Sequence, residues 1–287
     1  MTESQGPLHK HHFLMRRLHS LSGIAPIGVF LIAHLTTNST IVWGALNGRA
    51  GEGMTERGVT TFQEEVTFLN GLPMLLLIEV TLWVSIAFHG ILGLYYARSG
   101  KSNLQAYRYG GNRRYALQRL TGYFSILFIF YHVASLRWGW SFLVPGGVTW
   151  SHTAAASTLA RALQGSQEGY TPAGLAVSIF YFVGVSCVVF HFANGMWTAA
   201  ITWGLTTSVA AQKRWGYVCA GLGVMMMGMA WASVIGFALL DPAEAQHIED
   251  QMHNESVTAP SSSALPEIAT TDPDQPEPIT QGDSSNG

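Results

Sequence analysis

The sequence predicts an all-α integral membrane protein with five membrane-spanning helices. Of its 287 residues, 48% are hydrophobic and 11% are charged, whereas a soluble domain carries about 25% charged residues. Five apolar stretches reach the roughly 20 residues that a helix needs to cross the hydrocarbon core of a bilayer. None of these stretches alternates with the period of two that strands of a membrane barrel show. The spanning elements are therefore expected to be helices.

The expected spans divide the chain into three parts. The five spans lie at about residues 18–40, 72–96, 116–138, 172–200 and 216–240. Pro26 lies inside the first span and Pro73 starts the second, and proline is better tolerated in membrane helices than in soluble ones. Residues 1–17 form a basic arm before the first span, so the membrane domain is expected over residues 18–240.

The distribution of basic residues predicts the orientation of the bundle. Eleven of the fifteen Lys and Arg residues fall on one side of the membrane: Lys10, Arg16, Arg17, Arg98, Lys101, Arg108, Arg113, Arg114, Arg119, Lys213 and Arg214. Loops rich in Lys and Arg stay in the cytoplasm. We therefore expect the N-terminus in the cytoplasm and the C-terminus outside, in the inner (cytoplasmic) membrane of the cell.

The remaining composition limits what else the chain can be. Residues 241–287 contain ten Asp or Glu, six Pro and no Lys or Arg, a composition that predicts a disordered acidic tail. The net charge of −2 gives no reason to expect nucleic acid. Cys187 and Cys219 lie in apolar runs and outside any haem-attachment motif, so we interpret them as packing residues.

Apart from His19 at the start of the first span, one histidine occurs in each of the first four spans. Each lies roughly 25 Å along its helix from the point of entry, at about 1.5 Å per residue. Because consecutive helices run in opposite directions, His34 and His132 are expected near the outer face, and His89 and His191 near the cytoplasmic face. The topology thus predicts two pairs of histidines at two depths.

Paired histidines at matched depths favour two b-type haems over other uses of a buried imidazole. A single membrane histidine can be a hydrogen-bonding residue at a helix interface or part of a proton relay. Neither role predicts one histidine on each of four helices. A haem iron instead takes two axial nitrogens from opposite faces of the ring. The chain contains no nucleotide-binding loop and no cysteine cluster, so such haems would connect a partner protein to a quinone.

Three segments resemble a known family: RRLHSLSGIAPIGVFLIAHLTTNS, LPMLLLIEVTLWVSIAFHGILGLYYAR and LQRLTGYFSILFIFYHV. Over about residues 14–240 the chain is similar to the di-haem cytochrome b anchor of succinate:quinone oxidoreductases and quinol:fumarate reductases, in its single-polypeptide, five-helix type. The resemblance implies a flavoprotein and an iron–sulfur subunit on the cytoplasmic face. It also implies a proximal haem on His89 and His191, a distal haem on His34 and His132, and menaquinone as the quinone.

A carboxylate in the second span is the main candidate for quinone chemistry. Glu79 lies about a third of the way into that span, near the depth of the distal haem, and an intramembrane carboxylate is a functional candidate by default. The resemblance supports proton exchange or quinone chemistry on the outer side. An interfacial residue wetted by a local cavity is the alternative, and Glu64 and Glu65 are weaker candidates for the same role.

Charged and polar residues at the cytoplasmic ends of the spans are candidates for holding haem propionates. Arg17 and Arg119 could neutralise these anions. Both also belong to the basic residues that predict the cytoplasmic side, so they could serve only as that signal. Ser20 could donate a hydrogen bond to a propionate. His19 could instead face a quinone on the cytoplasmic side.

The function expected from these observations is electron transfer. The chain would be the non-flavin subunit of a succinate dehydrogenase, passing electrons from the iron–sulfur subunit through two b haems to menaquinone. Reverse flow would make it a quinol:fumarate reductase subunit. The alternatives are a di-haem anchor for a hydrogenase or formate dehydrogenase, against which HSLSG and QRLTG argue, and a haem-free proton-coupled transporter.

Overall fold

The computed structural model describes residues 11–46, 53–99, 110–166 and 169–258. Throughout these residues the regular elements are helices. Five segments are long and apolar enough to cross a membrane: His12–Leu46, Leu75–Arg98, Gly111–Arg137, Pro172–Thr202 and Val209–Leu239. The five predicted spans are confirmed, and the last one begins at Val209 rather than near residue 216.

The first span consists of two helices joined at Ala25. Helix α2 (His12–Ile24) is followed by α3 (Pro26–Trp43), and the 3₁₀ turn η1 (Gly44–Leu46) ends the segment. Pro26 stands at the start of α3, where its missing N–H removes no helical hydrogen bond. Helix α2 begins within the stretch expected to be a basic arm, of which residues 1–10 lie outside the described residues.

The other spans are single long helices. They are α5 (Leu75–Ser99), α6 (Gly110–His132), α8 (Pro172–Thr202) and α9 (Val209–Leu239). Helix α6 continues directly into a π-helical turn, η2 (Val133–Arg137). Hydroxyl caps begin the last two helices: Thr171 accepts from the Gly174 N–H at 3.0 Å, and Ser208 accepts from the Ala211 N–H at 3.2 Å.

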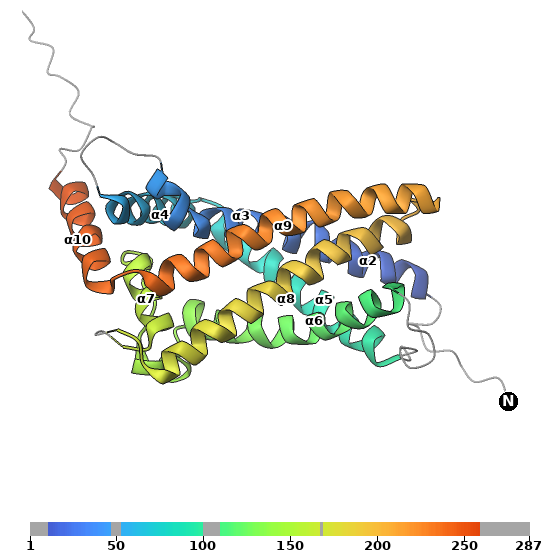
Figure 1. Cartoon of the computed structure of the whole chain (residues 1–287), viewed down its shortest axis with the longest axis horizontal. Helices are drawn as coiled ribbons and strands as arrows, with labels where there is room; N and C mark the ends of the chain where they lie inside the picture. Colours follow the sequence, from blue (N-terminus) through green and yellow to red (C-terminus); the bar gives the residue numbers. More distant parts are fainter. Residues whose placement is uncertain (1–10, 47–52, 100–109, 167–168, 259–287) are drawn as a thin grey trace, which may run out of the picture.

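The helices pack into an elongated bundle (Figure 1). Helix α8 contacts both α6 and α9, α3 contacts α9, and α2 contacts α5 and α8. Large apolar side chains cover the outside, and Leu76 in α5 is 74% exposed. An apolar exterior of this kind is the surface that a lipid environment favours.

Three amphipathic helices gather at one end of the bundle, and we call them the cap. They are α4 (Met54–Asn70), α7 (Ala155–Gln164) and α10 (Pro242–Thr258). Figure 1 shows them at the opposite end from α2. We call these two ends the capped end and the N-terminal end. The short turns η3 (Ser141–Leu143) and η4 (Pro145–Gly147) precede α7.

Helix α10 contradicts the predicted disorder of residues 241–287 over the first part of that segment. The Asp241 carboxylate caps the helix by accepting the Ala243 N–H at 2.8 Å. Ala245 and Ile248 are buried in the same apolar cluster as residues of α4 and α7. The composition of the whole tail hid this amphipathic stretch, because its Pro and Ser residues lie mainly after α10. Residues 259–287 lie outside the described residues.

Candidate functional site

The four span histidines meet in the two predicted pairs. His34 on α3 and His132 at the end of α6 have ring centroids 5.8 Å apart, with an interplanar angle of 78°. His89 on α5 and His191 on α8 have centroids 6.1 Å apart, with an angle of 88°. The first pair lies toward the capped end, since α4 contacts α3 and Leu136 of η2 packs against the apolar cluster of the cap. The second pair lies toward the N-terminal end, where His19 of α2 stacks on His89.

The spacing within each pair fits a metal bound between the two rings. An imidazole nitrogen binds a first-row metal at about 2.0–2.1 Å. The ring centroid lies roughly 1 Å behind that nitrogen, so two rings on opposite sides of one metal have centroids about 6 Å apart. The described residues contain no group of three or more His, Cys, Asp or Glu suited to a metal ion. Two protein ligands per site match the axial positions of a haem iron.

Backbone carbonyls hold both rings of the pair at the N-terminal end. The Nδ1–H of His89 donates to the His19 carbonyl at 2.9 Å, and the Nδ1–H of His191 donates to the Gln118 carbonyl at 3.0 Å. A carbonyl can only accept, so the proton is on Nδ1 and Nε2 is free to bind a metal. Metal-ligating histidines commonly show this arrangement.

The pair toward the capped end is held differently. His132 Nδ1 is buried and has no hydrogen-bond partner among the described residues. His34 has the Asn38 amide 3.4 Å from its Nδ1, although that amide donates its better hydrogen bond to the His34 carbonyl at 2.7 Å. Aromatic rings surround this pair: Phe30 stacks on His34, and Phe128 stacks on His132.

Of the predicted propionate and quinone residues at the N-terminal end, His19 lies against the His89 ring, whereas Arg17 and Ser20 contact Trp203. The ring of His19 stacks on that of His89, with centroids 4.0 Å apart. Arg17 lies over the Trp203 ring, and Ser20 accepts a hydrogen bond from the Trp203 indole at 2.9 Å. Arg17 Nε and His19 Nδ1 are buried without a partner among the described residues, which makes both atoms available to a ligand.

Arg119 differs from Arg17 because its guanidinium already has a protein acceptor. It donates to the carbonyl of Ala97, near the end of α5. A nearby network that the sequence analysis missed connects to His191 instead. Arg114 donates to the Asn194 side chain at 3.1 Å, Asn194 donates to the Gln118 side chain at 2.7 Å, and Gln118 donates to the His191 carbonyl at 3.0 Å.

That network could have been suspected from composition. Gln118 and Asn194 are polar side chains within or at the border of expected spans, and Asn194 is 5% exposed. Polar side chains inside the membrane usually find a partner across a helix interface. Only the three-dimensional structure shows that the partner is the helix turn carrying His191.

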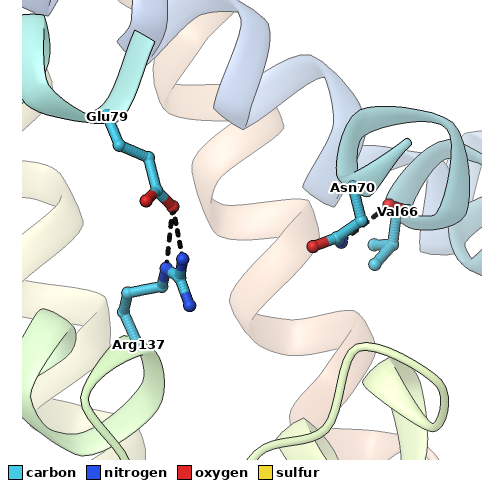
Figure 2. Close-up of polar contacts among 4 residues, drawn as sticks. All are labelled: Val66, Asn70, Glu79 and Arg137. Atoms are coloured by element: carbon cyan, nitrogen blue, oxygen red, sulfur yellow. Dashed lines mark hydrogen bonds and ion pairs between the residues drawn. The ribbon is translucent and has the colours of Figure 1, made fainter. Parts of the chain in front are cut away.

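Glu79 forms an ion pair at the capped end of α5 (Figure 2). Its carboxylate accepts from Arg137 Nε at 2.8 Å, and Arg137 Nη2 lies 2.7 Å from the same oxygen. Arg137 ends the π-helical turn that begins just after His132, so the pair lies on the element that follows a predicted haem ligand. Figure 2 also shows Asn70, whose amide stays within α4 by donating to the Val66 carbonyl at 2.9 Å.

The two weaker carboxylate candidates, Glu64 and Glu65, take no part in this ion pair. Glu64 and Glu65 are exposed on α4 and show no ion pair among the described residues. The pairing of Arg137 with Glu79 was not predicted from the sequence. A charged residue so soon after a span histidine was the available signal.

Comparison with known proteins supports the resemblance found in the sequence. The chain is 30% identical over 226 residues to the succinate dehydrogenase cytochrome b558 subunit of Bacillus subtilis (strain 168). The match covers 78% of this chain and 96% of that protein. No family model matches the chain. With five apolar helices long enough to cross a bilayer, the chain is a multi-pass membrane protein that belongs to the family of succinate dehydrogenase cytochrome b subunits.

Proposed function

We propose that this chain is the di-haem membrane anchor of a succinate dehydrogenase. His89 and His191 would hold the proximal haem b, and His34 and His132 the distal haem b. The observation that carries the proposal is the presence of two imidazole pairs, each with centroids about 6 Å apart as two axial ligands of one metal require. Membership of a cytochrome b family supports haem as the group between the rings.

The proposed orientation follows from the basic residues of the N-terminal end. The excess of Lys and Arg on that side of the membrane supports a cytoplasmic location for the N-terminal end. A flavoprotein and an iron–sulfur subunit would dock there, beside the His89–His191 pair, and the cap would lie outside. When bound, the two haems would supply one-electron carriers between the iron–sulfur subunit and a quinone, by resemblance menaquinone.

Free donors at the N-terminal end support a role in binding anionic haem propionates. The buried Nε of Arg17 has no partner among the described residues. Arg119 has five N–H donors, of which the Ala97 carbonyl occupies one. Ser20 contacts Trp203 as Arg17 does, but its hydroxyl donates to the Arg17 carbonyl at 2.9 Å, so its role as a propionate donor would require that hydrogen bond to be exchanged. We assign His19 to the same end, either to a propionate or to a quinone.

Glu79 is the proposed proton-exchanging residue for the quinone. Quinone reduction needs protons as well as electrons, and a carboxylate within the membrane is the available group. The Glu79 carboxylate pairs with Arg137, which ends η2. The contact of Glu79 with the turn that follows His132 supports proton exchange near the proposed distal haem.

Haem quantitation with redox titration of the purified complex tests the proposal. We expect two haems b per chain with separate potentials, and co-purification of a flavoprotein and an iron–sulfur subunit. The two potentials, compared with those of succinate and of the quinone, would distinguish succinate oxidation from fumarate reduction. A flat reduced-minus-oxidised spectrum would refute the proposal and favour a haem-free transporter.

A further inference from the structure

Two five-residue segments in different helices share one pattern. HSLSG occupies His19–Gly23 on α2, and QRLTG occupies Gln118–Gly122 on α6. Both have leucine third, a hydroxyl residue fourth and glycine fifth. In the structure each segment faces a histidine on a neighbouring helix: HSLSG faces His89, and QRLTG faces His191.

The first residue of each segment supplies the hydrogen-bond acceptor for that histidine. The carbonyls of His19 and Gln118 accept the Nδ1–H of His89 and His191 at 2.9 and 3.0 Å. Each carbonyl also accepts from the hydroxyl of the fourth residue of its segment: Ser22 donates to His19 at 2.9 Å, and Thr121 donates to Gln118 at 3.3 Å. The two contacts are equivalent although they join different helix pairs.

The glycine at the fifth position makes room for the imidazole ring. A Cβ at Gly23 would lie 2.5 Å from Cε1 of His89, and a Cβ at Gly122 would lie 2.8 Å from Cε1 of His191. Both distances are too short for any side chain to be added without displacing the ring. Glycine costs about 1 kcal/mol relative to alanine inside a helix, so its presence at the same step of both segments indicates a packing requirement.

We propose that HSLSG and QRLTG are two copies of an imidazole-seating motif that fixes both ligands of the proximal haem. The carbonyl of the first residue sets the tautomer, and the glycine one turn later lets the ring approach closely enough to reach it. This inference rests on the proposed haem function, and it assigns Gly23, Gly122 and Gln118 as positioning residues.

The first side chain of each copy adds a second contact to the seated histidine. In HSLSG the imidazole of His19 stacks on the His89 ring at an interplanar angle of 13°. In QRLTG the amide of Gln118 donates to the His191 carbonyl at 3.0 Å. The two copies therefore share the carbonyl and the glycine, and differ in how their first side chain holds the partner helix.

Alanine substitutions at the two glycines test the motif in the intact complex. Gly23→Ala and Gly122→Ala should each abolish the optical and low-spin ferric EPR signals of the proximal haem and leave those of the distal haem. Gly228→Ala in α9 is the matched control, because a Cβ there meets nothing within 4 Å. It should keep both signals. The amount of chain in the membrane is measured by immunoblot for every variant.

The outcomes separate this inference from the function on which it rests. A parent complex without haem would refute the proposed function itself. Two haems in the parent and both signals unchanged in the glycine variants would overturn the motif alone. Loss of both haems together, or the same loss in Gly228→Ala, would also overturn it, by showing a general packing effect.

A measurement on the parent complex covers the case in which the variants do not accumulate. With ¹⁵N-labelled histidine, hyperfine spectroscopy of the ferric proximal haem should show iron-bound Nε2 and an exchangeable proton on Nδ1 for both ligands. Iron bound to Nδ1 of either ligand would overturn the motif.

Discussion

The two ends of the bundle hold their histidine pairs by different means. At the N-terminal end, backbone carbonyls accept the Nδ1–H of both His89 and His191. At the capped end, His132 Nδ1 has no partner among the described residues, and the neighbours of the pair are mainly aromatic rings. The three cap helices pack at the capped end, whereas α2 lies beside the histidine pair at the N-terminal end.

The comparison indicates that helix crossing alone can bring two imidazoles together, and that a hydrogen bond to one ring nitrogen fixes in advance which nitrogen the ring presents. Neutral imidazole has two tautomers, and the partner of one nitrogen determines which is present. The N-terminal end makes that choice with the protein backbone. At the capped end packing restrains the ring planes, and the bound group would complete the choice.

Replacing a single histidine gives the largest expected effect and tests whether the two pairs are independent. His191→Ala should abolish the proximal haem and leave the distal one, and His132→Ala should do the reverse, since an iron with one axial ligand lost is held far less firmly. Redox-resolved optical spectra and haem quantitation measure both. Retention of both haems in either variant would contradict the ligand pairing.

Glu79→Gln tests whether proton exchange is confined to the capped end. The variant keeps the shape of the side chain but loses the carboxylate, so quinone turnover should fall by about 100-fold, the lower range for a general acid–base group. Steady-state quinone reduction with both haems retained is the measurement. Glu64→Gln is the comparison, and slowing in that variant instead would move the role to α4.

Glu249 tests the stability of the cap. It is 2% exposed and caps α7, accepting the Ala156 N–H at 2.7 Å and contacting Ser157 Oγ at 2.5 Å. Glu249→Ala would leave buried donors unsatisfied and should lower the unfolding free energy of the cap by about 1–3 kcal/mol. Glu249→Gln keeps an acceptor and should cost less. Hydrogen exchange of the α7 and α10 amides measures the unfolding free energy of the cap in both variants.

The same residue predicts a pH dependence of the cap. Burial raises the pKa of the Glu249 carboxyl above its ordinary value, and the hydrogen bonds from Ser157 and Ala156 and the charge of Arg161 only partly oppose this. The folded cap therefore binds the proton more tightly than the unfolded chain does. Its stabilisation is fully present below the ordinary carboxyl pKa and is lost as pH rises through the raised value.

Hydrogen exchange, corrected for the intrinsic rate, should show the cap opening more often as pH rises above about 4.3, the ordinary glutamate value. In Glu249→Gln this dependence should flatten. An increase of cap stability with pH across that window would contradict the assignment.

Asn38→Leu is expected to have the smallest effect. The Asn38 amide lies 3.4 Å from His34 Nδ1, longer than a good hydrogen bond, and it mainly serves the His34 carbonyl. The variant should retain the distal haem, and its free energy of unfolding should change by at most about 1 kcal/mol. Loss of the distal haem would show that the capped end, like the N-terminal end, depends on a hydrogen bond to its ligand.

Much of the bundle could be predicted because the relevant signals are local. A long apolar run must become a helix in a bilayer, since its backbone groups have no other partner there. Alternating helix direction then sets the depth of His34, His89, His132 and His191, and their pairs meet in the structure as expected. The cap was missed because α4, α7 and α10 are short and of mixed polarity, and their burial depends on one another.

Five spans and the expected depths of four histidines follow from the amino-acid sequence, because hydrophobic length and alternating helix direction depend on the chain alone. The packing of the helices sets which carbonyl faces which imidazole, brings Gly23 and Gly122 against the rings of His89 and His191, and pairs Arg137 with Glu79. These contacts join helices far apart in the sequence. Their geometry depends on the crossing of packed helices, which no local pattern encodes.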